Sequence, residues 1–250
     1  MVALDEVDST NTDAMRRLTS ANVAPDRPFW VVSDLQTAGK GRSGRGWSHP
    51  RGNLAASLAL PAPADAETRG QLALVAGLAV YDAIADALRS VAPTARIELK
   101  WPNDVLVERA KISGILIEAT EIAGEWWAVV GCGINIVSAP EIAGRAAISL
   151  NEMGTDTSAP EVFKALAANW SRHLELWRHG ENFAAIRARW LQSSLPIDTS
   201  LTVNAGDEQV AGYFAGLGPR GELLIKDPSG RIRRVTFGDV AIAPSRGIED

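Results

Sequence analysis

The sequence changes character at Leu195-Pro196, and this change restricts the fold more than any other feature of the chain. Before that point, β-type runs alternate with segments of helical periodicity, whereas only short β-type runs separated by turn signals follow it. We therefore predict two domains, residues 1–196 and 197–250. Five short strands at turn-punctuated intervals favour a small β-barrel for the second domain. The 250 residues are enough for one large and one small domain.

The first domain is predicted to be an α+β structure. Its longest predicted helix covers 69–88, with small residues in its middle that would allow close packing. Other helices are expected after the capping residues 8–11, through Leu18, and over 160–177 and 182–193. The β-type runs that predict strands are 2–7, 29–35, 53–60, 97–100, 105–108, 112–120 and 126–136.

Composition and charge exclude several classes of protein. Thirty acidic and 25 basic side chains give a net charge of -5, so no diffuse positive field would hold nucleic acid or an anionic membrane. The single cysteine, Cys132, excludes a disulfide framework and fits a reducing compartment. The most apolar stretch, 72–85, is too short to span a bilayer and is interrupted by Asp82. Residues 1–10 do not have the pattern of a signal peptide. We expect a cytoplasmic protein.

A glycine-rich, basic loop follows the predicted strand at 29–35. It covers 36–46, and no acidic residue occurs between Asp34 and Asp65. Glycines let backbone N–H groups approach an anion, and arginine binds carboxylate or phosphate oxygens with a planar fork. The loop thus predicts a local anion site, with a surface hairpin of no special role as the alternative. The cationic residues of the loop are Lys40, Arg42 and Arg45, and a fourth, Arg51, follows the loop.

The loop also contains the spacing G-x-G-x-x-G, from Gly39 to Gly44. A dinucleotide-binding fold is excluded because residues 45–52 cannot begin the helix that this motif requires. The glycine spacing of a Walker A loop is absent, and so are the H-R-D and D-F-G strings of protein kinases.

Three further strings carry chemistry. Residues 100–104, KWPND, place a lysine, an amide and a carboxylate around a turn, although a plain type I turn has the same composition. Lys111 stands where a polar turn enters an apolar run, so its ammonium could face an anion. Residues 131–135, GCGIN, place glycines inside a strand, which usually marks the close approach of a ligand or another backbone. The three histidines lack the spacing of metal ligands, and Cys132 and the serines lack the context of a nucleophile.

In their order, these strings resemble bacterial biotin protein ligases. The resemblance extends from about residue 3 to about residue 245, and it is carried by five motifs. The short form of that family, which lacks an N-terminal DNA-binding domain, is the one that this chain resembles. The resemblance implies a mixed-sheet catalytic domain of the biotin/lipoate ligase type with a C-terminal SH3-like β-barrel. The motifs are Ser9-Thr10-Asn11, QTAGKGRSGRGW at 36–47, KWPND at 100–104, KISGILIE at 111–118 and GCGIN at 131–135.

The resemblance implies a biotin--[biotin carboxyl-carrier protein] ligase. In that reaction, biotin and ATP form biotinyl-5'-AMP and pyrophosphate with Mg²⁺, and a lysine of the carrier then displaces AMP. The implied partner is the biotin carboxyl carrier protein or domain of acetyl-CoA carboxylase or a related carboxylase. No DNA and no membrane partner is expected, and the protein would be a monomer or a homodimer.

Residue roles follow from the same resemblance. Lys111 and Arg42 are the implied catalytic residues, and Asp104 is the implied Mg²⁺ ligand. The implied biotin-binding residues are Ser9, Thr10, Asn11, Gln36, Lys40, Gly41, Arg42, Lys111 and Gly114. Those implied for ATP and the adenylate are Arg42, Arg45, Trp47, Asn103, Asp104, Lys111 and Asn135.

The sequence departs from the family pattern at two places. Lys40 and Ser43 stand where many relatives have arginine, so the loop carries less positive charge. The ATP contact that the family takes from its C-terminal domain is matched only roughly, by residues 244–246. Two other functions remain as alternatives. One is a lipoate or octanoate ligase of the same superfamily, and the other is a non-catalytic module that binds single-stranded nucleic acid.

Overall fold

The computed structural model describes residues 1–20, 25–141, 146–206 and 208–243. Its largest element is a seven-stranded sheet with the strand order β1-β2-β3-β7-β6-β5-β4. Strands β1 and β2 pair in parallel and every other neighbouring pair is antiparallel, which confirms the predicted mixed sheet. The strands are β1 (Val2–Leu4), β2 (Phe29–Ser33), β3 (Leu54–Pro61), β4 (Ile97–Lys100), β5 (Asp104–Val107), β6 (Ala110–Ile122) and β7 (Glu125–Ile134).

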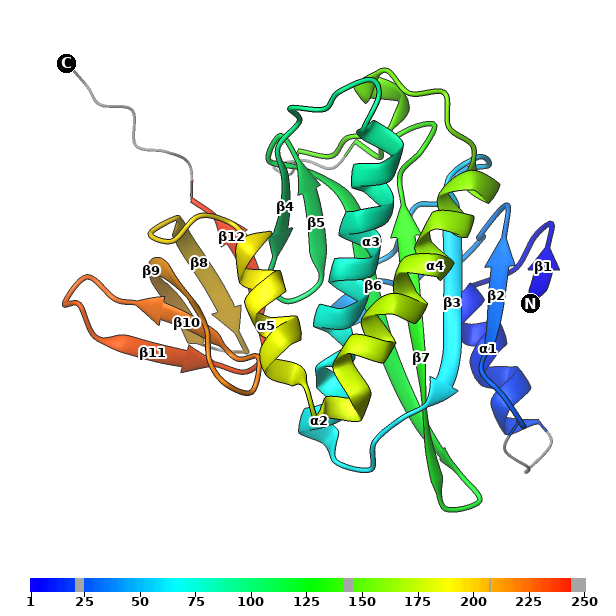
Figure 1. Cartoon of the computed structure of the whole chain (residues 1–250), viewed down its shortest axis with the longest axis horizontal. Helices are drawn as coiled ribbons and strands as arrows, with labels where there is room; N and C mark the ends of the chain where they lie inside the picture. The colour runs from blue at the N-terminus through cyan, green and yellow to red at the C-terminus, as the bar shows by residue number, and fades with distance from the viewer. Residues whose placement is uncertain (21–24, 142–145, 207, 244–250) are drawn as a thin grey trace.

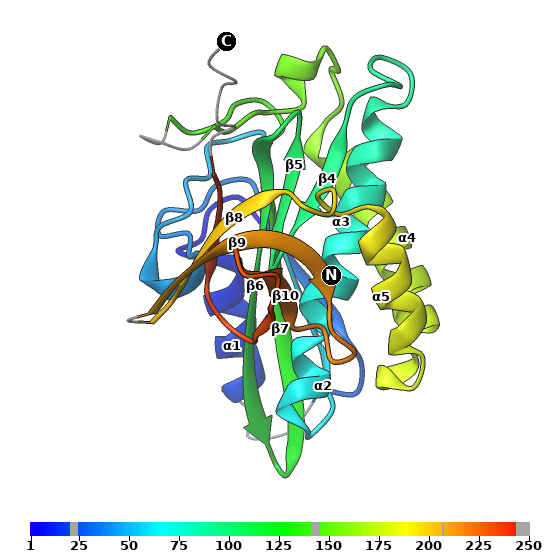
Figure 2. The same ribbon diagram turned by 90° about the vertical axis from the view of Figure 1, so that its left-hand side faces the viewer.

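Helices cover both faces of this sheet, as Figure 2 shows. Helix α1 (Thr10–Thr19) packs on one face, and α3 (Leu72–Leu88), α4 (Ala159–Trp177) and α5 (Phe183–Gln192) form a layer on the other. Successive residues of β7 face opposite sides, so Ala128 and Val130 join the helix-layer core while Trp127 and Val129 pack with α1. A strand buried on both faces is apolar throughout, which explains the unbroken apolar run in its sequence. Short 3₁₀ turns occur at Arg42–Gly44, Asn151–Met153 and Arg178–Gly180.

The long helix predicted over 69–88 is in fact two helices. Helix α2 (Ala66–Gly70) is capped by Asp65, whose side chain accepts a hydrogen bond from the backbone N–H of Thr68, and α3 begins anew at Leu72. The stretch 72–85, the only one that the sequence analysis considered, is too short to cross a bilayer. Taken together, Ala66–Leu88 are long and apolar enough to do so. Buried core helices pass the same test, and 72% of its most apolar window is buried inside the structure.

The C-terminal part is a five-stranded antiparallel sheet, in the order β11-β10-β9-β8-β12. It lies beside the β4 and β5 edge of the large sheet (Figure 1). Lys100 at the end of β4 donates a hydrogen bond to the Val240 carbonyl (2.9 Å), and the Trp101 indole donates to the Gly221 carbonyl (3.0 Å). The strands are β8 (Ser200–Ala205), β9 (Glu208–Leu217), β10 (Leu223–Lys226), β11 (Ile232–Val235) and β12 (Asp239–Ile242). The domain boundary at residue 196 stays a prediction.

Candidate functional site

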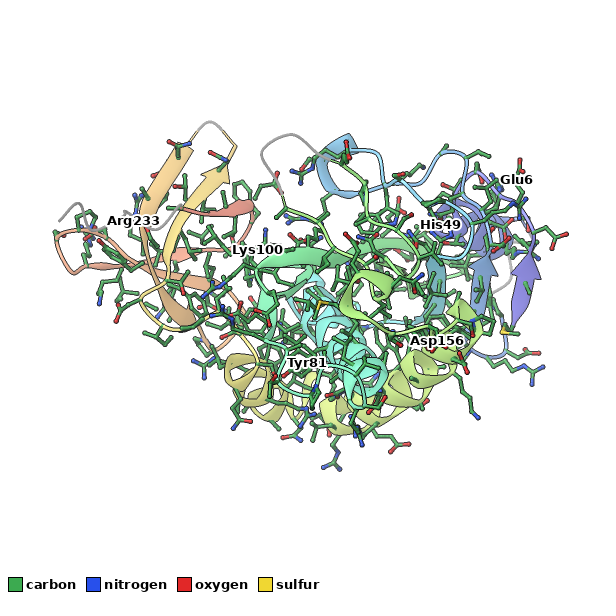
Figure 3. All side chains as sticks on the ribbon, turned by 90° about the horizontal axis from the view of Figure 1, so that it is seen from above. Glu6, His49, Tyr81, Lys100, Asp156 and Arg233 are labelled. Carbon is green, nitrogen blue, oxygen red and sulfur yellow. The ribbon has the colours of Figure 1, made fainter. Side chains whose placement is uncertain are left out.

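One large pocket, of about 1300 Å³, is lined by every residue to which the sequence analysis assigned a role. It also includes residues of the C-terminal sheet, among them Asp239 and Val240. Seen from above, Lys100 and His49, which both line the pocket, lie on the side of the sheet away from the helix that carries Tyr81 (Figure 3). The residues with an assigned role that the structure brings together are up to 126 positions apart in the sequence, from Ser9 to Asn135.

The start of α1 forms one end of the pocket. Ser9 caps the helix, and its hydroxyl accepts from the backbone N–H of Thr12 (3.5 Å). The next residue, Thr10, donates its backbone N–H to the Gln36 side-chain carbonyl (2.8 Å). Gln36 is held there by a parallel bridge to Val7, where the predicted strand 2–7 continues after a break that follows β1. Helix and loop are thereby joined at the pocket wall.

Glycines on β6 and β7 form a flat floor. Gly114 and Gly133 are directly paired across the two strands, and the Trp47 indole lies on both of them. A Cβ at position 133 would lie 2.4 Å from this ring, so only glycine admits Trp47 here. Glycine is also required at position 131, because a Cβ there would lie 2.3 Å from the Asn11 side-chain oxygen. The GCGIN glycines thus admit two side chains, Asn11 and Trp47, where the sequence analysis expected a ligand or another backbone.

Asp104 is a buried carboxylate between two lysines. Its Oδ1 lies 2.5 Å from the Lys111 ammonium, and its Oδ2 lies 2.8 Å from that of Lys100. Burial by itself would raise the pKa of Asp104, but the two ammonium groups outweigh burial and hold that pKa below its usual value. Lys100 was not among the assigned residues. Its place in KWPND was visible in the sequence, but its two partners, Asp104 and Val240, depend on the fold.

The basic loop reaches the C-terminal sheet. Arg42 donates to the Asn103 side-chain oxygen (3.3 Å) and to the Gly238 carbonyl (3.2 Å), and Arg45 forms an ion pair with Asp239 (2.6 Å). Burial lowers the pKa of Arg42 from its usual value, while Asp239 and Asp104 oppose that shift. No sequence pattern marked Asp239, which lies nearly two hundred positions from these arginines. The residues 244–246, matched to the family's C-terminal ATP contact, lie outside the described part of the chain.

The lining side chains give the pocket a local positive charge. Six are cationic and three are acidic, which leaves +3 in a chain whose net charge is -5. Two anionic molecules would be attracted to such a pocket and their mutual repulsion reduced. The cations are Lys40, Arg42, Arg45, Lys100, Arg109 and Lys111, and the acids are Asp104, Glu141 and Asp239.

The donor set does not fit a resident Mg²⁺ at Asp104. Both oxygens of this carboxylate are paired with ammonium groups, whereas Mg²⁺ requires oxygen ligands in an octahedral arrangement. Within the described residues, no three histidine, cysteine, aspartate or glutamate side chains are grouped so as to hold a metal ion. The role implied for Asp104 is therefore better described as fixing Lys111 and Lys100.

Cys132 lines the pocket, but its thiol is buried, and burial raises its pKa to about 12. We expect the folded protein at pH 8 to react with a thiol reagent at least about a hundredfold more slowly than a denatured sample, since only the thiolate is nucleophilic. Titration with Ellman's reagent, with and without guanidinium, checks this. Equal rates in both samples would contradict the burial.

Comparisons with known proteins show the family of the chain. A sequence profile of the biotin/lipoate A/B protein ligase family matches residues 4–135, which is more than half of the chain. The chain belongs to this family. A biotin--[acetyl-CoA-carboxylase] ligase of Paracoccus denitrificans is 34% identical, over 91% of this chain and 95% of that protein. The Mycobacterium tuberculosis protein of the same name is also 34% identical, over 93% and 85%.

A solved structure has the same architecture. The biotin protein ligase from Aquifex aeolicus in complex with biotin and ATP superposes with a TM-score of 0.80 and 30% identity, covering 97% of this chain and 98% of that one. The resemblance to biotin protein ligases and the α+β fold class are therefore confirmed. The roles of the individual pocket residues stay predictions.

Proposed function

We propose that this protein is an ATP-dependent biotin protein ligase. The observation that carries the proposal is the convergence of all five motifs on one cationic pocket, with its glycine floor and buried lysine-aspartate cluster. Biotin and ATP are the bound molecules named for the Aquifex relative. The acceptor is a lysine of the biotin carboxyl carrier protein or domain of a carboxylase, in keeping with the names of the relatives. The unpaired Cys132 fits a reducing compartment such as the cytoplasm.

The first step joins two anions. A carboxylate oxygen of biotin attacks the α-phosphorus of ATP, the bond from that phosphorus to the bridging oxygen breaks, and pyrophosphate leaves. Lys111 and Arg42 both line the pocket, and we assign to their positive charges the stabilisation of the phosphate oxygens as negative charge develops. A Mg²⁺ ion carried by ATP would supply further screening of the phosphate charges, and no residue role assigned here depends on it. In the second step, a lysine amine of the carrier attacks the acyl carbon and AMP leaves.

The nucleotide end of the pocket combines an aromatic ring and an amide. Asn135 donates its amide to the Ile148 carbonyl (3.2 Å), and its buried Oδ1 has no hydrogen-bond partner among the described residues. That oxygen can accept a hydrogen bond from the amino group of adenine. Trp47 offers its ring for stacking.

Replacing Trp47 by alanine tests this assignment. We expect the KM for ATP to rise about fivefold or more, because aromatic stacking contributes roughly 1 kcal/mol. Steady-state kinetics at saturating biotin measures it. Trp126→Ala is the matched control, since Trp126 contacts Arg69 and is not part of the pocket lining. An unchanged KM for ATP in Trp47→Ala would contradict stacking.

Biotin-dependent exchange of labelled pyrophosphate into ATP tests the proposed function itself. We expect exchange with biotin and Mg²⁺, and none above background with lipoate or octanoate at equal concentration. Exchange with lipoate or octanoate instead of biotin would support the other branch of the family. A folded protein that shows no exchange with any of the three acids would contradict the proposal.

A further inference from the structure

Two polar side chains lie behind the pocket wall and were not assigned a role from the sequence. Ser57 on β3 is fully buried, and Glu118 on β6 is partly buried. Neither lines the pocket, but both contact Asn11, which does. Glu118 is part of the string KISGILIE, in a stretch that is otherwise largely apolar. A charged residue in such a strand needs a partner, and here that partner is an amide of the pocket.

The amide of Asn11 is fixed at both ends. Its Nδ2 donates to Glu118 Oε2 (2.9 Å) and to the Leu116 carbonyl (3.4 Å), and its Oδ1 accepts from the Ser57 hydroxyl (2.6 Å). A carboxylate and a carbonyl can only accept, so Nδ2 must face Glu118 and Oδ1 must face Ser57. The close approach of Oδ1 to Gly131 leaves this amide little room to move.

This orientation determines the acceptors to which the Ser57 and Thr10 hydroxyl groups donate their protons. Ser57 gives its one proton to Asn11, so Ser57 can only accept from Thr10, whose hydroxyl lies 2.7 Å away. The Thr10 hydroxyl could also donate to Gln36 Oε1 (3.1 Å), but it has only one proton. The Ser57 oxygen is nearer (2.7 Å), and Gln36 Oε1 already accepts the backbone N–H of Thr10 (2.8 Å), so we assign the proton to Ser57. Thr10 and Gln36 both line the pocket, and the hydrogen-bonding capacity that each has left has a defined polarity. The Thr10 oxygen is an acceptor, and the Gln36 Nε2 is a donor beside it.

We propose that Glu118 and Ser57 are positioning residues that set this acceptor-donor pair through Asn11. Such a pair matches the adjacent N–H and C=O of a cyclic urea, which is the head group of biotin. The inference rests on the proposed function and deepens it, because it names the part of the substrate that the chain of hydrogen bonds selects. Lipoate and octanoate carry no urea and gain nothing from the arrangement.

An exchange of the amide and carboxylate groups between positions 11 and 118 tests the proposal. Asn11→Asp places two carboxylates face to face, and we expect the KM for biotin to rise about tenfold or more, as loss of a buried hydrogen bond to a charged group does. In the double variant Asn11→Asp/Glu118→Gln, the new amide donates to the new carboxylate, which still accepts from Ser57. We expect the KM for biotin of this variant to be at least about threefold below that of Asn11→Asp, because the repulsion is removed although the bond to the Leu116 carbonyl is not restored.

Single substitutions of Glu118 complete the test. Glu118→Gln keeps an acceptor and should change the KM for biotin by less than about threefold, whereas Glu118→Lys offers only a donor and should raise it about tenfold. Glu121→Lys, on the same strand but exposed, is the matched control. The affected part of the substrate is the urea group. Desthiobiotin keeps the urea but lacks the sulfur, so its KM should change by the same factors as the KM for biotin in each variant. The KM for ATP should stay unchanged throughout.

Two results would overturn the inference. One is a double variant no better than Asn11→Asp alone, and the other is a Glu118→Lys effect no larger than that of Glu121→Lys. A general loss of structure would instead raise the KM for ATP, lower kcat and lower the unfolding temperature together, and it would not be reversed by the second substitution. Failure of the proposed function is distinct, because the wild-type protein would then show no exchange with biotin.

Discussion

Lys111→Ala should lower the rate of biotin-dependent pyrophosphate exchange by about 10² to 10³, as the removal of one preorganised oxyanion donor commonly does. The ammonium of Lys111 lies 2.5 Å from Asp104 and 5.4 Å from the centre of the Trp47 ring, and Lys111 is assigned to both the biotin and the ATP site. Asp104 holds it there while remaining ionised at neutral pH, because its pKa is lowered. The loss should fall mainly on kcat, since the charge on phosphate develops in the transition state.

The same substitution leaves Asp104 with only Lys100, so a stability control is required. Thermal unfolding separates a loss of folding from a loss of catalysis. Lys164→Ala is the matched control, because Lys164 is exposed on α4 and is not part of the pocket lining. An exchange rate within about fivefold of wild type in Lys111→Ala would be too small for the loss of such a donor and would exclude the proposed role.

Arg42→Gly should release the adenylate before transfer. Arg42 connects the loop to Asn103 and to the Gly238 carbonyl of the C-terminal sheet, and we have assigned its charge to the acyl phosphate. Hydrogen bonds to a charged group contribute about 1.5–3 kcal/mol, so the adenylate should dissociate roughly 10- to 100-fold faster. Free biotinyl-5'-AMP would then acylate lysines of unrelated proteins.

Detection of biotin on a bystander protein such as albumin, with ATP and biotin present, measures this release. Arg51→Gly is the matched control, since Arg51 is an exposed arginine of the same segment that pairs with Asp34 outside the pocket lining. If Arg42→Gly still labels only the carrier protein, Arg42 does not retain the adenylate.

Local patterns in the sequence predicted most of the secondary structure. Apolar runs and turn residues marked the seven strands of the large sheet, because periodicity depends only on near neighbours. The errors in the predicted elements arise from local caps and breaks, which hydrophobic periodicity does not detect. The helix predicted over 69–88 breaks before Leu72, after the turn that Asp65 caps, and the strand predicted over 2–7 ends at Leu4.

The sequence by itself determined the residue types of the site. The glycines, the arginines, Lys111, Asn103 and Asn135 all stood in unusual strings of the sequence, and the order of these strings identified the family. Tertiary structure alone decided which side chains pair: Lys100 and Lys111 with Asp104, Arg45 with Asp239, and Asn11 with Glu118. Except for Lys100 and Lys111, these partners are more than a hundred positions apart in the chain. Sheet pairing and packing brought them within hydrogen-bond distance, and no periodicity of a single chain segment encodes such a contact.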